Sequence, residues 1–548
     1  MHAMDALIRE EVEAYSHHIP EFSVTGRRLL ATKYSTKLKQ LQESQRVFTL
    51  ERDCALVQIV NEICEARAEA LLSCDPLRMS PEEFVPTDEH LRRCPCLAGL
   101  PLAQLQKRFL ILRNFNCRLQ NSLSFIDFSI NDDHSLLANG ARALRGIIFQ
   151  HVKLAWWLSV LKEQQSPAAA RPEIEVDRHR AREATETTGD KESVFAQVFE
   201  QLHGIQPSLL RGADRAFKCQ FVGEFGDDFG GLYRECLAQI SSELQSTLLP
   251  LLKPCPNAVY GVGENREVFV PNAHLRKDSR LVQMAEFLGK LVGIAVRTKT
   301  PLDLNLPSVV WKLLVQEPVT RRDIERIHYG CFQVVDTIHN IDVHGITESM
   351  FDEIVDATFT VRSSTSHEDV ELVPGGAHVR VKWDDKAEYA RAVESYRLSE
   401  FRPVCDDIAR GVATMLPAPT LGLFTWKELL TLVCGKATVD IDLLRRRTIY
   451  GDGCQASDPH IAFFWDVLGE FTDEQKSAFL RFVWGRSRLP THAADFTQDF
   501  KISGLPKAAG RADMYLPIAH TCFFSIDLPM YSCRDVMKDK LLYAITHC

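Results

Sequence analysis

The sequence has no pair of cysteines at the spacing of a zinc-binding motif. Its 16 cysteines are scattered over 548 residues, and Cys94-x-Cys96 is the nearest approach to a Cys-x-x-Cys pair. Cys54, Cys64 and Cys74 recur at equal intervals, but on one helix each would be turned about 80° from the last, so we expect them not to converge. The pattern argues against structural zinc, and we predict no metal and no cofactor.

The chain also lacks an excess of positive charge, a secretion signal and a long apolar run. A formal net charge of −9 disfavours polyanionic partners, so we expect no nucleic-acid binding. Residues 1–5 lack the basic segment and apolar run with which a secretion signal begins. The most apolar stretch, 146–161, is interrupted by polar residues and is too short to span a bilayer. We therefore expect no membrane insertion, reduced thiols and a cytoplasmic location, with the nucleus as the alternative.

One glycine-rich segment, residues 221–231, lacks the features of a nucleotide-binding loop. It has no Gly-Lys-Ser/Thr ending, and it carries Glu224, Asp227 and Asp228 where a phosphate would be repelled. We predict a structural turn that leads into a helix over 232–244.

The composition that remains, with 45% hydrophobic and 25% charged residues, is typical of a globular protein with several folding units. Residues 1–165 show helical periodicity, with apolar stripes over 56–70 and 102–119. Residues 166–193 are charged and rich in Ala and Thr, which predicts a linker that contains one short strand at 174–177. From Val194 the pattern mixes helices and strands, so the fold class is predicted to be α+β.

Cys522 lies in the stretch Leu516-Pro-Ile-Ala-His-Thr-Cys-Phe-Phe524 near the end of the chain. Residues 521–528 alternate, which places Cys522 on one face of a predicted strand together with Phe524, Ile526 and Leu528. A cysteine in such a row is most often buried core. Cys522 is also the first residue on that face, however, and a protonated histidine nearby favours the thiolate, so core thiol and reactive thiol both remain open here.

Two helices with start signals flank this strand. Thr472 is followed three residues later by Gln475, which predicts a capping box at the start of a helix that ends before Gly485. Ser532 and Asp535 have the same spacing and predict the start of a final helix with Met537 and Leu541 on its buried side.

With these elements in place, the sequence resembles the HECT-type ubiquitin ligases. The stretch 516–523, continued by 527–532 and 540–545, is similar to the family's motif around its catalytic cysteine. Five further segments resemble parts of the family domain in the family's order: 221–235, 287–304, 372–376, 471–475 and 479–490. The resemblance covers residues 172–548. Its overall pattern is nearest to the large HECT ligases that carry propeller repeats, although this sequence has no such repeats.

The resemblance implies a bilobal HECT domain behind a helical region: helical residues 1–165, a linker at 166–193, a larger N-lobe at 194–446 and a small C-lobe at 447–548. It implies that Cys522 accepts ubiquitin from a conjugating enzyme as a thioester and passes it to lysine on a protein substrate, with His520 and Thr521 in supporting roles. It places the docking site for the conjugating enzyme near 315–390 and a hinge near 444–448. For residues 1–165 we hypothesise substrate or regulatory contacts.

Two departures from the family pattern keep alternatives open. Members usually have asparagine two residues after the cysteine, where this sequence has Phe524, and we expect a polar contact to be lost there. Many members also carry a short tail with a phenylalanine after the final helix, whereas this sequence stops at Cys548. A catalytically silent HECT-like adaptor is therefore the main alternative function, and a cysteine hydrolase is a weaker one because no histidine is marked out as its base.

Overall fold

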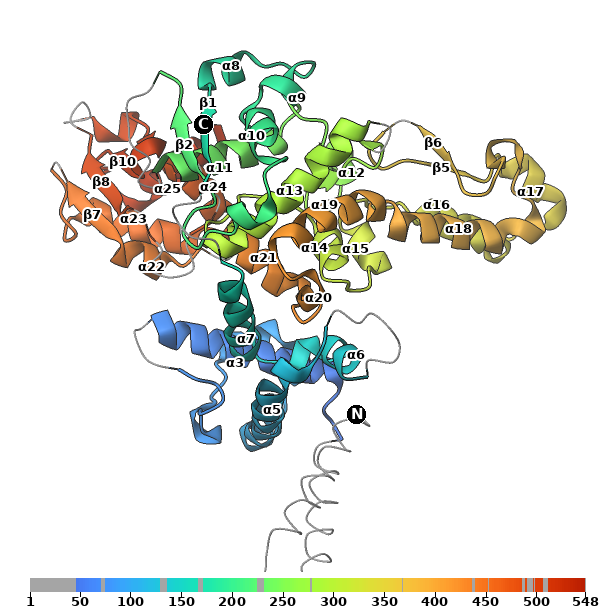
Figure 1. The fold of residues 1–548 in the computed structure, drawn as a ribbon, viewed down its shortest axis with the longest axis horizontal. Helices are drawn as coiled ribbons and strands as arrows, with labels where there is room; N and C mark the ends of the chain where they lie inside the picture. The colour runs from blue at the N-terminus through green and yellow to red at the C-terminus, as the bar shows by residue number, and fades with distance from the viewer. Residues whose placement is uncertain are drawn as a thin grey trace, which may run out of the picture. The chain divides into compact units, whose positions relative to one another are not determined.

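The computed structural model describes residues 46–69, 74–128, 136–165, 171–223, 231–275, 278–366, 368–435, 439–451, 453–484, 488–489, 496, 498–505 and 511–547. The chain divides into two compact units, Met1–Val160 and Leu161–Cys548, and each is described by itself. Figure 1 shows helices throughout and only short strands, which confirms the α+β class.

The N-terminal unit is helical over its described residues, as its periodicity predicts. Its α-helices are α3 (Leu50–Glu69), α4 (Asp88–Arg93), α5 (Leu102–Ser122), α6 (Leu136–Ala143) and α7 (Gln150–Glu163), the last of which ends beyond the unit. The predicted stripes are buried at Leu56 and Val60 on α3 and at Phe109 and Leu112 on α5. Both helices face one core because each turns its apolar side to the other.

The prediction that Cys64 and Cys74 do not converge is wrong. Their Sγ atoms lie 3.2 Å apart. The prediction assumed that both cysteines lie on one helix, but α3 ends at Glu69, before Cys74. Within the described ranges, nowhere do three or more His, Cys, Asp or Glu side chains gather as a metal-holding group, and every helix there is too short or too polar to traverse a bilayer.

The second unit starts with a two-stranded parallel sheet. Strand β1 (Glu173–Val176) pairs in parallel with β2 (Lys218–Phe221), which confirms the strand predicted at 174–177. The helices α8 (Arg178–Glu183) and α9 (Gly189–Glu192) also lie in the segment predicted as a linker, and α10 (Val194–Leu202) follows directly. This segment is therefore folded from residue 171 onward.

The centre of this unit is the packing of α13 (Ser279–Thr298) against α19 (Arg402–Met415). A Cβ atom on Gly289 would lie 1.9 Å from the carbonyl oxygen of Ile408, and one on Gly411 would lie 1.7 Å from that of Glu286. The two helices approach this closely because both contact positions are glycine. The apolar helix predicted over 284–296 is confirmed as part of α13, and every residue of that range is buried except Glu286, which is partly exposed.

Further elements surround these two helices. Helix α11 (Gly231–Leu244) confirms the helix predicted over 232–244, while most of the glycine-rich turn before it lies outside the described residues. The remaining elements are β3 (Leu252–Pro254) antiparallel to β4 (Phe269–Pro271), α12 (Pro256–Tyr260), α14 (Ser308–Leu314), α15 (Arg321–Glu325), α20 (Ala418–Leu421) and α21 (Trp426–Cys434).

Residues 333–399 form a projecting subdomain with a hydrophobic core of its own. It forms the arm at the right of Figure 1. Its core is built around Phe351, Phe359 and Val393, which are all almost completely buried. Its elements are α16 (Gln333–His339), the 3₁₀ helix η8 (Ile341–His344), α17 (Glu348–Ile354), the antiparallel hairpin β5 (Thr360–Arg362) and β6 (Asp369–Glu371), and α18 (Lys386–Ser399).

A buried polar network fastens the base of the projecting subdomain. Glu400 accepts hydrogen bonds from the backbone N–H and the hydroxyl of Ser364, at 2.6 and 2.7 Å, and pairs with Arg397 at 2.9 Å. The ring Nδ1 of His328 lies 3.3 Å from the same hydroxyl. Burial, helped by the positive charge of Arg397, lowers the pKa of His328 to about 4. The network is therefore built around a neutral histidine.

Acidification is expected to weaken this junction. The unfolded chain binds a proton at His328 below a pH of about 6.5, whereas the folded chain binds it only near pH 4, so stability is complete above about 6.5 and falls by up to about 3 kcal/mol as the pH drops to 4. Replacing His328 by Asn should flatten this part of the pH profile, and replacing the exposed His378 by Asn should not. Hydrogen exchange of the subdomain amides at pH 7.0, 5.5 and 4.5 measures the effect. Equal slopes in all three proteins would contradict it.

The C-terminal part of the unit is a four-stranded sheet covered by helices. The strand order is β7 (Thr448–Gly451), β8 (Phe500–Gly504), β10 (Ser525–Leu528) and β9 (Ile518–His520), with β7, β8 and β10 parallel and β9 antiparallel to β10. Helices α23 (Pro459–Glu470), α24 (Asp473–Trp484) and α25 (Arg534–His547) share one apolar core with the sheet. The short helix α22 (Ile441–Arg446) precedes β7.

Candidate active site

Cys522 lies in the tight connection between β9 and β10 rather than on a strand. Residues Thr521–Phe523 form a single turn of 3₁₀ helix, η14, and β10 begins only at Ser525. The prediction that Cys522 is the first residue of the strand is therefore wrong, although the alternation is correct from Phe524, Ile526 and Leu528 onward, which are all fully buried. The backbone places Cys522 at the tip of a hairpin, and its side chain lies outside the described part of the structure.

Phe524 anchors this turn to the core. It adopts the left-handed backbone conformation, with φ 44° and ψ 56°, and its amide closes the turn onto the carbonyl oxygen of Thr521 at 3.4 Å. Its ring is fully buried, stacks on Trp484 at 4.0 Å between centroids, and contacts Phe500 at 5.0 Å. Its carbonyl oxygen accepts a hydrogen bond from the backbone of Lys501 at 3.0 Å. The position of the expected polar contact is thus occupied by an aromatic stack.

His520 and Thr521, the two residues predicted to assist, both lie at the surface beside Cys522. The Nε2 atom of His520 lies 3.1 Å from Oδ2 of Asp527 across the hairpin. Thr521 is exposed, and among its described contacts its backbone oxygen closes the turn to Phe524. The structure therefore brings His520 and Thr521 together with Cys522 on one turn, and it adds Asp527, which sequence reasoning missed.

A second set of polar contacts fixes the approach to β9. Asp513 accepts hydrogen bonds from the backbone N–H and the hydroxyl of Ser532, at 2.9 and 2.6 Å, and the hydroxyl bond lowers the pKa of this carboxyl. Tyr531 donates its hydroxyl to the carbonyl oxygen of Tyr515 at 2.9 Å. The spacing of Ser532 and Asp535 predicts a capping box, but Ser532 binds Asp513 instead. Helix α25 starts at Arg534. The interaction holds the two ends of the hairpin segment together.

The predicted capping box before the hairpin is confirmed. The backbone N–H of Thr472 donates to the side chain of Gln475 at 3.0 Å, and the N–H of Gln475 donates to the Thr472 hydroxyl at 3.3 Å. The helix that it opens, α24, ends at Trp484, which is the residue on which Phe524 stacks. The local start signal therefore helps to place the anchor of the candidate site.

Another thiol and imidazole meet in the same core. Cys454 Sγ lies 3.4 Å from Nε2 of His460, and both residues are more than nine-tenths buried. Burial raises the pKa of the Cys454 thiol to about 11, with Asp458 and Asp527 adding to the shift, and it lowers the pKa of His460. A buried neutral thiol of this kind is a poor nucleophile. The pair is structural, and Cys454 does not compete with Cys522 as the candidate nucleophile.

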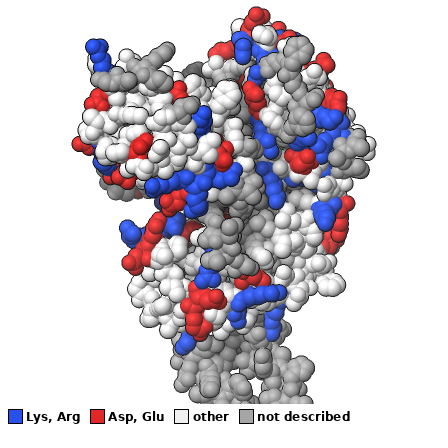
Figure 2. Space-filling view, turned by 90° about the vertical axis from the view of Figure 1, so that its left-hand side faces the viewer, with Lys and Arg blue, Asp and Glu red and all other residues white. Residues whose placement is uncertain are grey.

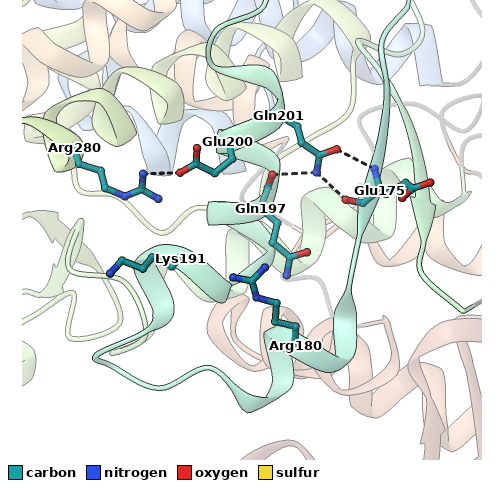
Figure 3. Close-up of a pocket in the computed structure, with 7 residues that line it drawn as sticks. All are labelled: Glu175, Arg180, Lys191, Gln197, Glu200, Gln201 and Arg280. Carbon is teal, nitrogen blue, oxygen red and sulfur yellow. Dashed lines mark hydrogen bonds and ion pairs between the residues drawn. The ribbon is translucent and has the colours of Figure 1, made fainter.

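A hollow in the described surface lies far along the chain from Cys522. It measures about 600 Å³ and lies among β1, α8, α9, α10 and the start of α13 (Figure 3). Arg280 pairs there with Glu200 at 2.5 Å, while Arg180 and Lys191 extend from α8 and α9. Its lining contains no cysteine, serine or histidine. These lining residues therefore offer no thiol for a thioester, and the hairpin remains the candidate site.

One side of the surface carries charges of both signs. On the side shown in Figure 2, basic and acidic side chains are interspersed, with broad uncharged areas between them. Phe523, directly after Cys522 on the turn, is 74% exposed. Further exposed apolar residues lie along the hairpin segment: Ile518 on β9 (46%), Met514 before β9 (74%) and Met530 after β10 (55%). Exposed apolar side chains on one hairpin segment favour contact with a protein partner.

Comparison with known proteins gives the same assignment. The family model described as "HECT-domain (ubiquitin-transferase)" matches residues 239–548. "E3 ubiquitin-protein ligase HERC2" of Mus musculus and of Homo sapiens is 35% identical over 461 residues, which cover 82% of this chain and 9% of each relative. "Probable E3 ubiquitin-protein ligase HECTD4" of Homo sapiens is 30% identical over 551 residues, 93% of this chain and 14% of the relative.

The match to the family includes every element of the hairpin and most of the second unit. The chain spans only a small share of the length of these relatives, so what they do as whole proteins is not transferred here. The match confirms the resemblance noted in the sequence. This chain belongs to the HECT-domain (ubiquitin-transferase) family.

Proposed function

We propose that the chain is a ubiquitin-protein ligase in which Cys522 carries ubiquitin as a thioester. The observation that carries the proposal is the place of Cys522 on a surface turn, between the exposed Thr521 and Phe523, with a buried anchor at Phe524 directly behind it. The backbone of such a turn is fixed while its tip stays accessible. A thiol used for transfer needs both properties.

The first step is a thioester exchange. The Cys522 thiolate attacks the carbonyl carbon that joins ubiquitin to the conjugating enzyme; a new C–S bond forms, the old one breaks, and the cysteine of the conjugating enzyme leaves as a thiolate. One thioester replaces another of similar energy, so the protein supplies mainly proximity and orientation.

The second step moves ubiquitin to a lysine of a protein substrate. The lysine nitrogen attacks the same carbonyl carbon, an amide bond forms, the C–S bond breaks and Cys522 is released. The amine must lose a proton in this step, and His520 and Thr521 are the neighbouring groups that we assign to support it. The exposed ring of Phe523 on the turn is proposed to contact the bound ubiquitin.

The projecting subdomain is proposed to dock the conjugating enzyme. It has a hydrophobic core of its own, yet several of its large apolar side chains are exposed to solvent. Val343 is 79% exposed, Val334 66%, Ile354 51% and Met350 44%. Exposed apolar residues on a separately folded arm are typical of a binding surface.

Charge placed on this surface should impair loading. We expect Val343→Asp combined with Met350→Asp to raise the concentration of charged conjugating enzyme needed for half-maximal loading of Cys522 about tenfold, which corresponds to about 1.4 kcal/mol of lost binding. The maximal loading rate should stay unchanged. Val222→Asp is the matched control, because Val222 is 47% exposed at the end of β2. An equal effect in control and double variant would disprove docking at this surface.

The sequence predicts a hinge between the two proposed lobes near 444–448. Leu443 and Leu444 are buried in the core of the C-terminal sheet and Thr448 is in β7, which favours a pivot before this segment. We propose that the pivot is Gly435, with φ 79° and ψ −179°, a conformation that is almost confined to glycine. The proposed lobes are then residues 194–435 and 439–548, and Arg488 donates to the Gly435 carbonyl oxygen at 3.0 Å.

Residues 1–165 are proposed to contact substrates or regulators. Deleting them should leave the loading of Cys522 intact and lower the modification of a substrate. Unchanged substrate modification would sink this assignment.

One assay separates the ligase from the silent adaptor. The full chain is incubated with activating enzyme, a panel of charged conjugating enzymes and ubiquitin, and is then run on a gel without reductant. We expect an adduct of one ubiquitin that disappears when thiol reductant is added. No adduct with any member of a broad panel would overturn the ligase function and favour the adaptor.

A further inference from the structure

We propose that Asp527 is a positioning residue for the second transfer, which orients the imidazole of His520 so that it can accept the proton of the attacking lysine. This role rests on the proposed function of Cys522. It deepens that function by assigning a pair of side chains, His520 and Asp527, to the removal of the proton.

The pairing of β9 and β10 brings the two side chains together. His520 lies opposite Ser525, and Asp527 lies two residues further along β10, so His520 and Asp527 are diagonal neighbours on one face of the hairpin. The other face carries Ile526 and Leu528 into the core. The imidazole is thus on the outer side of the sheet, next to the turn that holds Cys522.

The contact selects one form of the imidazole ring. Asp527 Oδ2 lies 3.1 Å from Nε2 of His520, and a carboxylate can only accept a hydrogen bond, so Nε2 must carry the proton. In the neutral ring this leaves the lone pair on Nδ1. His520 is therefore held as a base, and the carboxylate stabilises the imidazolium that forms when Nδ1 takes a proton.

The anchor behind the turn gives this pair a fixed geometry. Phe524 is locked between Trp484 and Phe500, and Ser525 is buried opposite His520. The strand that bears Asp527 and the turn that bears Cys522 are therefore held by the same core. A base on this hairpin has a fixed place relative to the backbone of the turn.

The atoms balance without a further reactant. The lysine nitrogen forms its bond to the ubiquitin carbonyl carbon, the bond from that carbon to Cys522 sulfur breaks, and the proton lost by the amine moves to Nδ1 of His520. The thiolate that leaves can take this proton back. No electron is transferred to or from an outside oxidant or reductant.

The test separates loading from discharge in the full chain. The protein is loaded with ubiquitin in a short pulse, the supply is stopped, and free lysine is added at increasing concentrations while the adduct is followed on gels without reductant. We expect Asp527→Asn to load at the wild-type rate and to discharge at least about tenfold more slowly at saturating lysine, with an unchanged half-saturating lysine concentration.

A double-mutant cycle shows whether Asp527 acts through His520. His520→Gln should slow discharge by a similar factor, and the double variant should be no slower than His520→Gln alone. Asp527→Glu should recover part of the rate. The matched control is Asp535→Asn, which removes a carboxylate that is 91% exposed at the start of α25 and should discharge normally.

The outcomes distinguish this role from the proposed function. A wild-type chain that never forms the adduct overturns both. A wild-type chain that loads, together with an Asp527→Asn variant that discharges at the wild-type rate, overturns only the role of Asp527. Additive losses in the double variant, or an equal loss in loading and discharge, also overturn it, because either result shows that Asp527 acts independently of His520.

Discussion

Replacing Cys522 by alanine is expected to abolish the reducible ubiquitin adduct completely while leaving the chain folded. Alanine removes only the sulfur, and the neighbouring thiol of Cys454 is a poor substitute because it is buried with its pKa raised to about 11. Serine at position 522 should form an ester that persists in thiol reductant, because an oxygen ester does not exchange with thiols. Gels with and without reductant, and the intact mass of the adduct, measure both results.

The matched control for this experiment is Cys533→Ala. Cys533 is the exposed cysteine just before α25 in the same lobe, so it tests whether any accessible thiol captures ubiquitin. We expect this variant to load at the wild-type rate. An adduct that persists in Cys522→Ala but is absent in Cys533→Ala would identify Cys533 as the nucleophile and refute the proposed mechanism.

The parts of this site that sequence could predict are those set by short-range patterns. The alternation of buried residues at Ile526 and Leu528 follows from the two-residue period of a strand. The Thr472–Gln475 box follows from orphan amides at a helix start, which only a nearby side chain can satisfy. Both are decided within a few residues, so the sequence contains all of the information that they need.

The parts that sequence could not predict depend on partners far along the chain or on a choice between two local forms. The sequence offers Ser532 a local partner, Asp535, at the start of the last helix. In the folded chain, Ser532 donates its hydrogen bonds to Asp513 instead. The pair of His520 and Asp527 requires a register that is known only once β9 and β10 are aligned. Cys64 and Cys74 meet because a helix ends between them, and periodicity does not reveal where a helix ends.

Phe524 shows the same competition in a single residue. An alternating pattern favours extended backbone at position 524, but the chain there is left-handed, a conformation that costs an L-residue with a bulky side chain about 1–2 kcal/mol. Asparagine, the residue expected here from the family pattern, tolerates this conformation better. In this chain the burial of a whole ring between Trp484 and Phe500 offsets the backbone cost.

Replacing Phe524 by alanine is therefore expected to destabilise the C-terminal sheet by about 3–5 kcal/mol, because the ring is lost while the backbone strain remains. The neighbouring variant Phe523→Ala, which truncates a ring that is 74% exposed, should change stability by less than about 0.5 kcal/mol. Hydrogen exchange of peptides from β8 and β10 in the full chain, read by mass spectrometry, reports the local free energy of opening for both variants. Equal protection in the two would show that the stack does not anchor the turn. If exchange accelerates only in Phe524→Ala, and the loading of Cys522 slows with it, then the aromatic anchor is what fixes the turn that presents the thiol.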